Sequence, residues 1–262
     1  MNTRSSKYLK VILSIIVFLA GIAPFSGLAT AANSSTYTNV YKKMSYNEQL
    51  KLTKFLFPFS DLSEGYNRNN YNEDQIINWL YNGLFDKKFR FNTDLVIDKN
   101  KQPFMKDGFQ YNPYSEKKIN AFLNQTFGIK LAKKSYYSED NFLNILYKNN
   151  YYYIIMPERG GGIGETVAQP HILFSLGKNL YVAKFTLHNF EYETIKDAGF
   201  DYKLIFNPLN WNNKFKALSF DNKEGYAIMQ KVASGKSYNW KLLKYSEGTI
   251  TDQQIKKYLQ NK

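Results

Sequence analysis

The sequence predicts an α+β fold in which an N-terminal helical half is followed by an antiparallel β-meander and a short C-terminal helix. Three observations support this class. Apolar residues recur at helical spacing up to about residue 148, they alternate with period two from residue 149 onward, and turn residues separate the alternating segments. Helices and strands that are segregated along the chain are typical of α+β proteins.

The first residues resemble a bacterial export signal in composition. Arg4, Lys7 and Lys10 form a positive segment, and an apolar run over residues 11–20 follows it. This run is shorter than the roughly 20 apolar residues that a membrane-spanning helix needs. We therefore expect residues 1–31 to be a signal peptide.

The expected cleavage site lies at the end of this segment. Ala29-Thr30-Ala31 supplies the small residues that signal peptidase requires, so we expect cleavage after Ala31. The alternative is an uncleaved anchor over residues 11–28, but small residues stand where an anchor favours bulky ones. Residues 32–40 are polar and predict a flexible leader, and no transmembrane segment is expected in the mature chain.

Residues 41–148 are predicted to be mainly helical. A first helix begins after Ser45, where Glu48 completes a capping box, and it ends before Pro58. A second follows Asn72 and carries an amphipathic stripe over residues 76–85.

Two further helices are predicted in this half. Ser115 is expected to cap a third helix, and Gly128 stands where a left-handed C-cap residue belongs. Ser138 is expected to open a fourth, with Phe142, Ile145 and Leu146 buried. Residues 89–112 contain turn signals and predict an irregular connection.

Residues 149–262 are predicted to form the sheet, either as a separate region or as one domain with residues 41–148. The predicted strands cover residues 151–156, 171–176, 180–190, 202–206, 215–220, 226–232 and 238–245. Gly177-Lys178-Asn179 and residues 233–237 predict hairpin turns, and Thr251 with Gln254 predicts the cap of a last helix.

A helix at residue 115 followed by strands up to residue 250 resembles the cystatin-like and nuclear-transport-factor-like architectures. The resemblance rests on the order of elements and on no residue motif. Because such folds support many unrelated functions, it implies no site residue.

The charge of the chain favours anionic partners. The chain carries 35 basic and 22 acidic residues, and removing residues 1–31 removes three basic and no acidic ones, which leaves a charge of +10. Such a charge concentrates a protein on polyanions. Only four basic residues are Arg, so the bidentate side chains used in specific nucleic-acid recognition are scarce. The Lys-rich composition of an AT-rich genome is the alternative explanation.

The composition also excludes several kinds of site. The chain has no Cys, so it contains no disulfide, thiolate metal site or thiol nucleophile. No motif implies a cofactor or a metal. Ser115 with Lys118 matches the Ser-x-x-Lys spacing of penicillin-binding proteins, but no Lys-Thr-Gly motif follows and a helix cap explains the pair.

A glycine-rich segment is the first candidate binding element. Its candidate residues are Arg159, Gly160, Gly161, Gly162, Gly164 and Glu165. A phosphate loop would lead into a helix, whereas Thr166, Val167 and Pro170 follow here. We expect a mobile loop over residues 157–170 that connects strands, or a loop that binds a partner.

The two histidines are the catalytic candidates. Strand alternation places His171 and His188 on the wetter face of one predicted hairpin, near acidic residues such as Glu191. Such a cluster has acid/base potential. The alternative is a pair of solvated strand histidines without a chemical role.

Aromatic and acidic residues complete the candidates. Tyr152, within the run 151–153, and Trp211 are candidates for stacking on sugar rings, although alternation buries part of any such run. Carboxylate pairs such as Glu73-Asp74 and residues 139–140 fall in predicted first helical turns, where acids stabilise the helix dipole.

These features lead to a hypothesis of a secreted, extracellular and non-catalytic binding protein of the bacterial cell envelope. Its expected partner is an anionic wall polymer or an envelope protein, and it is expected to associate with the wall. The alternatives are a cell-wall hydrolase with a histidine or carboxylate site, and a secreted toxin or virulence factor.

Overall fold

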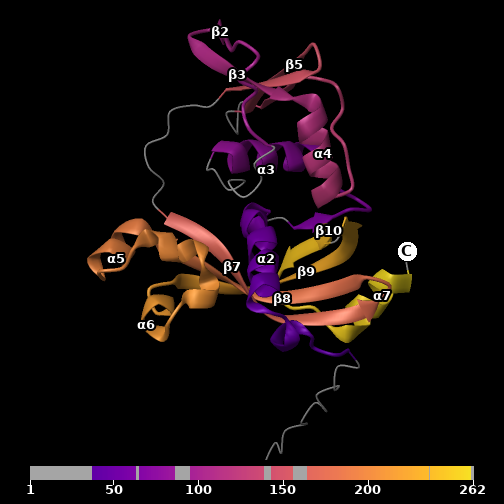
Figure 1. Ribbon diagram of the computed structural model, residues 1–262, viewed down its shortest axis with the longest axis vertical. Coiled ribbons are helices and arrows are strands. Elements are labelled where there is room, and N and C mark those ends of the chain that lie inside the picture. Colours follow the sequence, from indigo (N-terminus) through magenta and orange to yellow (C-terminus); the bar gives the residue numbers. More distant parts are fainter. Residues whose placement is uncertain are drawn as a thin grey trace, which may run out of the picture. The chain divides into compact units, whose positions relative to one another are not determined.

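The computed structural model describes residues 37–62, 65–85, 95–138, 143–155, 164–235 and 237–260. The expected signal peptide, its cleavage after Ala31 and the first part of the leader lie outside the described residues. The chain has α+β architecture with two antiparallel five-stranded sheets. Helices are interspersed between the strands (Figure 1). The predicted order of a helical half followed by one meander is therefore wrong.

The first two predicted helices form where their capping residues stand. α2 (Tyr46–Leu56) follows Ser45, whose hydroxyl accepts from the Glu48 amide while the Glu48 carboxylate accepts from the Ser45 amide. α3 (Glu73–Phe85) follows Asn72, whose side-chain oxygen accepts from the Asp74 amide.

The third predicted helix, α4 (Glu116–Thr126), follows Ser115 and ends before Gly128, which has a φ of 75°. Ser115 occupies the predicted N-cap position, but its side chain makes no capping hydrogen bond.

The larger sheet has the order β1-β10-β9-β8-β7, and all of its neighbours are antiparallel. Its strands are β1 (Tyr66–Asn67), β7 (Gly164–Gly177), β8 (Leu180–Glu191), β9 (Phe220–Ser234) and β10 (Ser237–Glu247). Both hairpins predicted for this region form. The β7–β8 turn places Lys178 and Asn179 at positive φ, as a two-residue hairpin turn requires.

The smaller sheet has the order β2-β3-β6-β5-β4. Its strands are β2 (Phe104–Lys106), β3 (Phe109–Ser115), β4 (Tyr136–Ser138), β5 (Leu143–Lys148) and β6 (Tyr151–Ile155). Two predictions are corrected here. Residues 104–112 are paired strands instead of an irregular connection, and residues 143–148 are a strand instead of the fourth helix. The strand at residues 143–148 forms because the turn Asn149-Asn150, with its positive φ angles, joins β5 to β6 as a hairpin. The turn Asp107-Gly108 likewise joins β2 to β3.

Two other predicted strands are helical. Residues 202–206 form the 3₁₀ helix η3 (Tyr202–Phe206), because the Asp201 carboxylate accepts from the Lys203 amide. Within residues 215–220 the chain first completes α6 (Asn213–Lys216), where Asn212 accepts from the Phe215 amide. Local side-chain caps therefore override the alternation of apolar residues.

The remaining helices are η1 (Tyr41–Lys43), η2 (Phe57–Asp61), α5 (Tyr192–Asp197), η4 (Pro208–Asn210) and α7 (Asp252–Gln260). The predicted capping box of α7 is present between Thr251 and Gln254. The end of the predicted leader is held in place, because the Val40 amide donates to Leu173 and Asn39 forms a bridge with Phe174.

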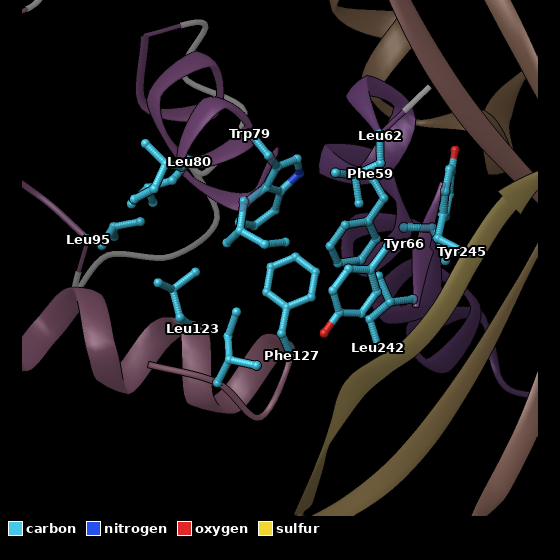
Figure 2. Close-up of a cluster of buried hydrophobic side chains, with 14 of the residues drawn as sticks. Phe59, Leu62, Tyr66, Trp79, Leu80, Leu95, Leu123, Phe127, Leu242 and Tyr245 are labelled. Atoms are coloured by element: carbon cyan, nitrogen blue, oxygen red, sulfur yellow. The ribbon is translucent and has the colours of Figure 1, made fainter. Parts of the chain in front are cut away.

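Apolar clusters cover both faces of the larger sheet. One face packs into the main core, where Phe59 stacks on Trp79 and both contact Phe127 (Figure 2). The main core also contains Tyr152 and Ile154 of the smaller sheet. On the other face of the larger sheet, α5 and α6 lie at one end and α7 lies at the other (Figure 1).

Candidate binding surface

His188 is buried, with only 7% of its surface exposed, and the prediction that it lies on a wetter face is wrong. The helical segment from α5 to α6 covers this end of β8, so that Trp211 packs edge-on against the imidazole at 5.2 Å. Burial, with a contribution from the nearby Lys216 ammonium, lowers the pKa of His188. The neutral ring is therefore favoured.

The contact between His188 and Ser219 does not activate the serine. The His188 Nδ1 atom lies 3.0 Å from Ser219 Oγ, and the Ser219 hydroxyl donates to the Lys216 carbonyl at 2.7 Å. The arrangement that satisfies both contacts has Nδ1–H as the donor to Oγ. A general base would instead accept the serine proton.

His171 lies in a different environment. It occupies a bulge after Pro170 in the edge strand β7, and its exposed imidazole lies 3.8 Å from Glu224. Glu224 also accepts from the Thr186 hydroxyl. Within the described residues, no three His, Asp or Glu side chains gather closely enough to hold a metal ion.

The glycine-rich candidate is only partly described. Arg159, Gly160, Gly161 and Gly162 lie outside the described residues. Gly164 and Glu165 begin β7, where they pair with Glu191 and Phe190. The expectation of a loop over residues 157–170 is therefore wrong from residue 164 onward, where the chain is part of the sheet.

Tyr152 and Trp211 are buried, so neither offers a ring face to a ligand. The Tyr152 hydroxyl donates to the Ala132 carbonyl at 3.0 Å, and the Trp211 indole donates to the Leu204 carbonyl at 2.6 Å. Both side chains stabilise the fold. The expectation that these two residues bind sugar rings is corrected.

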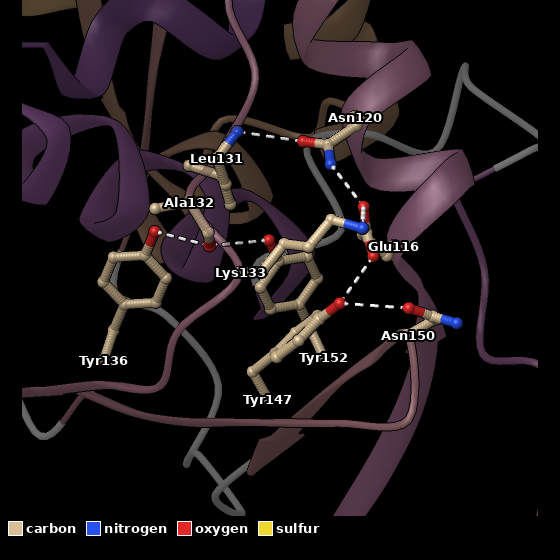
Figure 3. Close-up of polar contacts among 9 residues, drawn as sticks. All are labelled: Glu116, Asn120, Leu131, Ala132, Lys133, Tyr136, Tyr147, Asn150 and Tyr152. Atoms are coloured by element: carbon tan, nitrogen blue, oxygen red, sulfur yellow. Dashed lines mark hydrogen bonds and ion pairs between the residues drawn. The ribbon is translucent and has the colours of Figure 1, made fainter.

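Glu73 and Glu116, at the starts of α3 and α4, are engaged in structural contacts. Glu116 accepts from the Tyr147 hydroxyl at 2.6 Å and pairs with Lys133 at 3.3 Å, while Asn120 links it to the Leu131 amide (Figure 3). The hydrogen bond from Tyr147 is the main cause that lowers the pKa of Glu116. An acid held in this way is a poor proton donor. Residues 139–140 lie outside the described residues.

The smaller sheet turns a second set of aromatic side chains away from the core. Tyr114, Tyr152 and Ile154 point into the main core. Because successive strand residues point to opposite faces, their neighbours lie on the other side of the sheet. We call this side the outer aromatic face, and its rings are Phe104, Phe109, Tyr111, Tyr137, Tyr151 and Tyr153.

Several of these rings are partly open to solvent. Tyr137 is 68% exposed and Phe109 is 53% exposed, while Tyr151, Tyr153 and Phe104 are half-buried. By contrast, Tyr111 is buried. The exposed apolar area is therefore spread over four of the five strands of this sheet.

The rings of the outer aromatic face pack against one another. Phe104 stacks on Tyr111 at 5.0 Å and tilts against Tyr153 at 4.9 Å. The Tyr151 hydroxyl donates to Asp98 at 3.0 Å, and this hydrogen bond fixes the Tyr151 ring. The same bond is the main cause that raises the pKa of Tyr151. These contacts hold the half-buried rings in fixed orientations.

Lysines accompany the rings. Lys101 lies over the Tyr151 ring at 5.4 Å, Lys148 is the register partner of Tyr151, and Lys106 is the register partner of Phe109. Register partners lie on the same face of a sheet. The outer aromatic face therefore combines partly exposed rings with ammonium groups.

Sequence reasoning missed most of this surface. Alternation places Tyr152 on the face opposite Tyr151 and Tyr153 without showing which face is buried, and the same holds for Tyr136 and Tyr137. The signal that would have located Phe104 and Phe109 is the turn Asp107-Gly108, a strong hairpin pattern.

Comparison of the chain with protein-family models, curated proteins and solved structures gives no match. Among the helices of the described residues, none is both long enough and apolar enough to cross a membrane.

Proposed function

We propose that the mature chain is a secreted, non-catalytic binding protein of the bacterial cell envelope that recognises an anionic wall polymer. The observation that supports this function best is the outer aromatic face, where partly exposed rings and lysines share one side of a sheet. Export rests on the signal-like composition of residues 1–31.

The charge of the chain supports an anionic partner. The +10 charge that remains after residue 31 attracts a polyanion over distances of about one Debye length, roughly 10 Å at 0.1 M salt. Most of the basic residues are Lys, which binds anions as a point charge and not through a planar fork. Such a protein binds a repetitive polymer of negative charge without needing a specific sequence of groups.

The histidine and carboxylate contacts support a function without catalysis. The Ser219 hydroxyl donates to a carbonyl, and Glu73 and Glu116 serve as acceptors for amide and hydroxyl groups that hold the fold. The resemblance to cystatin-like or nuclear-transport-factor-like architectures stays a prediction and has no part in this proposal.

Co-sedimentation with purified wall sacculi tests the proposal. The mature chain, residues 32–262, is expected to pellet with intact sacculi at low salt and to stay in solution after the anionic polymers are removed. A variant with Gln at Lys101, Lys106 and Lys148 should bind more weakly.

The matched control carries Gln at the exposed Lys196, Lys203 and Lys214, which lie on the α5–α6 segment. Both variants lose the same charge, so a difference between them assigns binding to the outer aromatic face. Absence of pelleting at every salt concentration would contradict the proposal, and equal loss in both variants would show that general charge alone retains the protein.

A further inference from the structure

The outer aromatic face has features that attraction to a polyanion does not require. A solvent-facing side of an antiparallel sheet is normally polar, because exposed apolar rings gain nothing from water. Here Tyr137 and Phe109 are more than half exposed. Lysines on a polar sheet would bind a polyanion equally well. The exposed rings therefore indicate a ligand that also has an apolar surface.

The rings at the centre of the face are arranged in advance of binding. Tyr153 packs against Phe104, and Tyr151 lies 6.3 Å from Tyr153 with its hydroxyl held by Asp98. Fixed side chains lose little conformational entropy when a ligand binds. This rigidity suits a ligand with a flat, rigid face of its own.

We infer that the polymer bound by this face has a repeating unit with a sugar ring, so that one unit stacks on Tyr153 and another on Tyr137, two strands away, while an anionic group lies beside Lys148. This inference rests on the proposed function. The C–H groups on one face of a pyranose are electropositive and meet the electronegative face of an aromatic ring. A polymer of linear polyol phosphates has the charge but lacks such a face.

Single-stranded nucleic acid has the same two elements, since its bases stack on aromatic rings and its phosphates pair with basic groups. The chain has only four Arg, and no Arg lies among the described residues of the smaller sheet. Among the described residues, this face therefore offers no stacking or bidentate contact from a guanidinium group. A sugar polymer is therefore favoured over nucleic acid, and a single-stranded oligonucleotide is included as a probe in the test.

Titration of the mature chain with three soluble probes of matched charge tests the inference. The probes are a phosphodiester-linked sugar oligomer, a poly(glycerol phosphate) of equal length, and oligo(dT). We expect the sugar oligomer to bind about tenfold more tightly than the poly(glycerol phosphate). The double variant Tyr137→Ala and Tyr153→Ala should lose that advantage, whereas Tyr137→Phe with Tyr153→Phe should retain it.

Tyr46→Ala with Tyr202→Ala is the matched control, because these tyrosines are 50% and 51% exposed and lie outside the smaller sheet. Equal affinity for the sugar oligomer and the poly(glycerol phosphate), unchanged by the Tyr137 and Tyr153 variants, would overturn the inference and leave the proposed function standing. Tightest binding to oligo(dT), lost in the Ala pair, would overturn it in favour of nucleic acid. Binding to none of the probes would overturn the proposed function itself.

Discussion

The Tyr136 hydroxyl donates a 2.9 Å hydrogen bond to Glu73 Oε1, which ties β4 to the first turn of α3. The same oxygen accepts from the Ala132 amide at 3.0 Å, and Lys134 lies 3.1 Å from the second carboxylate oxygen. Burial acts to raise the pKa of Glu73, but these hydrogen bonds and the lysine outweigh it and lower the pKa. Glu73 is thus a structural link between α3 and the smaller sheet.

Glu73→Ala should destabilise the protein, because it removes the acceptor of two hydrogen bonds. We expect a loss of about 1–3 kcal/mol in the free energy of unfolding, measured by urea denaturation. Asp74→Ala is the control, since Asp74 is the exposed neighbour in the same helical turn. Equal stability of the two variants would refute the link.

His188 should make stability depend on pH below neutrality. Because its pKa in the folded protein is lowered by burial and by Lys216, protons bind the unfolded chain first as the pH falls below about 6.5. The folded state therefore loses stability as the pH falls below about 6.5, with a slope of at most about 1.4 kcal/mol per pH unit. Measured by urea denaturation at each pH, His188→Gln should flatten this slope, and an unchanged slope would show that the histidine is not responsible.

Gly225 should resist substitution. It lies in β9 beneath the ring of Phe185, which stacks on Tyr245 at 5.4 Å, and a Cβ atom at residue 225 would overlap that ring. Gly225→Ala is expected to cost about 1–3 kcal/mol in thermal or urea unfolding, as overpacking does. Ser234→Ala, at the exposed end of the same strand, should be neutral, and a Gly225→Ala protein as stable as the wild type would contradict this packing.

The tryptophans should be shielded from solvent. The chain has three Trp residues, and Trp79, Trp211 and Trp240 are all buried. We expect blue-shifted fluorescence and weak quenching by iodide in the folded protein. A Trp→Phe series should then leave no readily quenched component, and strong quenching assigned to Trp211 would restore its candidacy as an exposed ligand-binding residue.

The elements with explicit capping or turn residues were predictable from the sequence. Ser45 with Glu48 and Gly177-Lys178-Asn179 are patterns whose chemistry specifies the local backbone. The helix predicted after Ser138 failed because spacing in a short apolar run does not separate helix from strand. The turn Asn149-Asn150 settled that choice in favour of a hairpin.

The candidate site was harder to predict, because burial depends on what covers each sheet face. Alternation placed His188 correctly on the face opposite Phe185, but the sequence does not show that the α5–α6 segment closes over that face. The sequence likewise predicts that Tyr151, Tyr152 and Tyr153 point to alternate faces of the sheet, but it does not show which face packs on the core. Tertiary packing decided both cases.

The most direct test of the central claim is the salt-dependent co-sedimentation of residues 32–262 with sacculi, before and after removal of their anionic polymers, for the wild type and the Tyr137→Ala, Tyr153→Ala protein. We predict strong binding of the wild type at low salt, which disappears when the polymer is removed and weakens markedly in the double variant. Wild-type binding that survives polymer removal, or no binding at all, would contradict it.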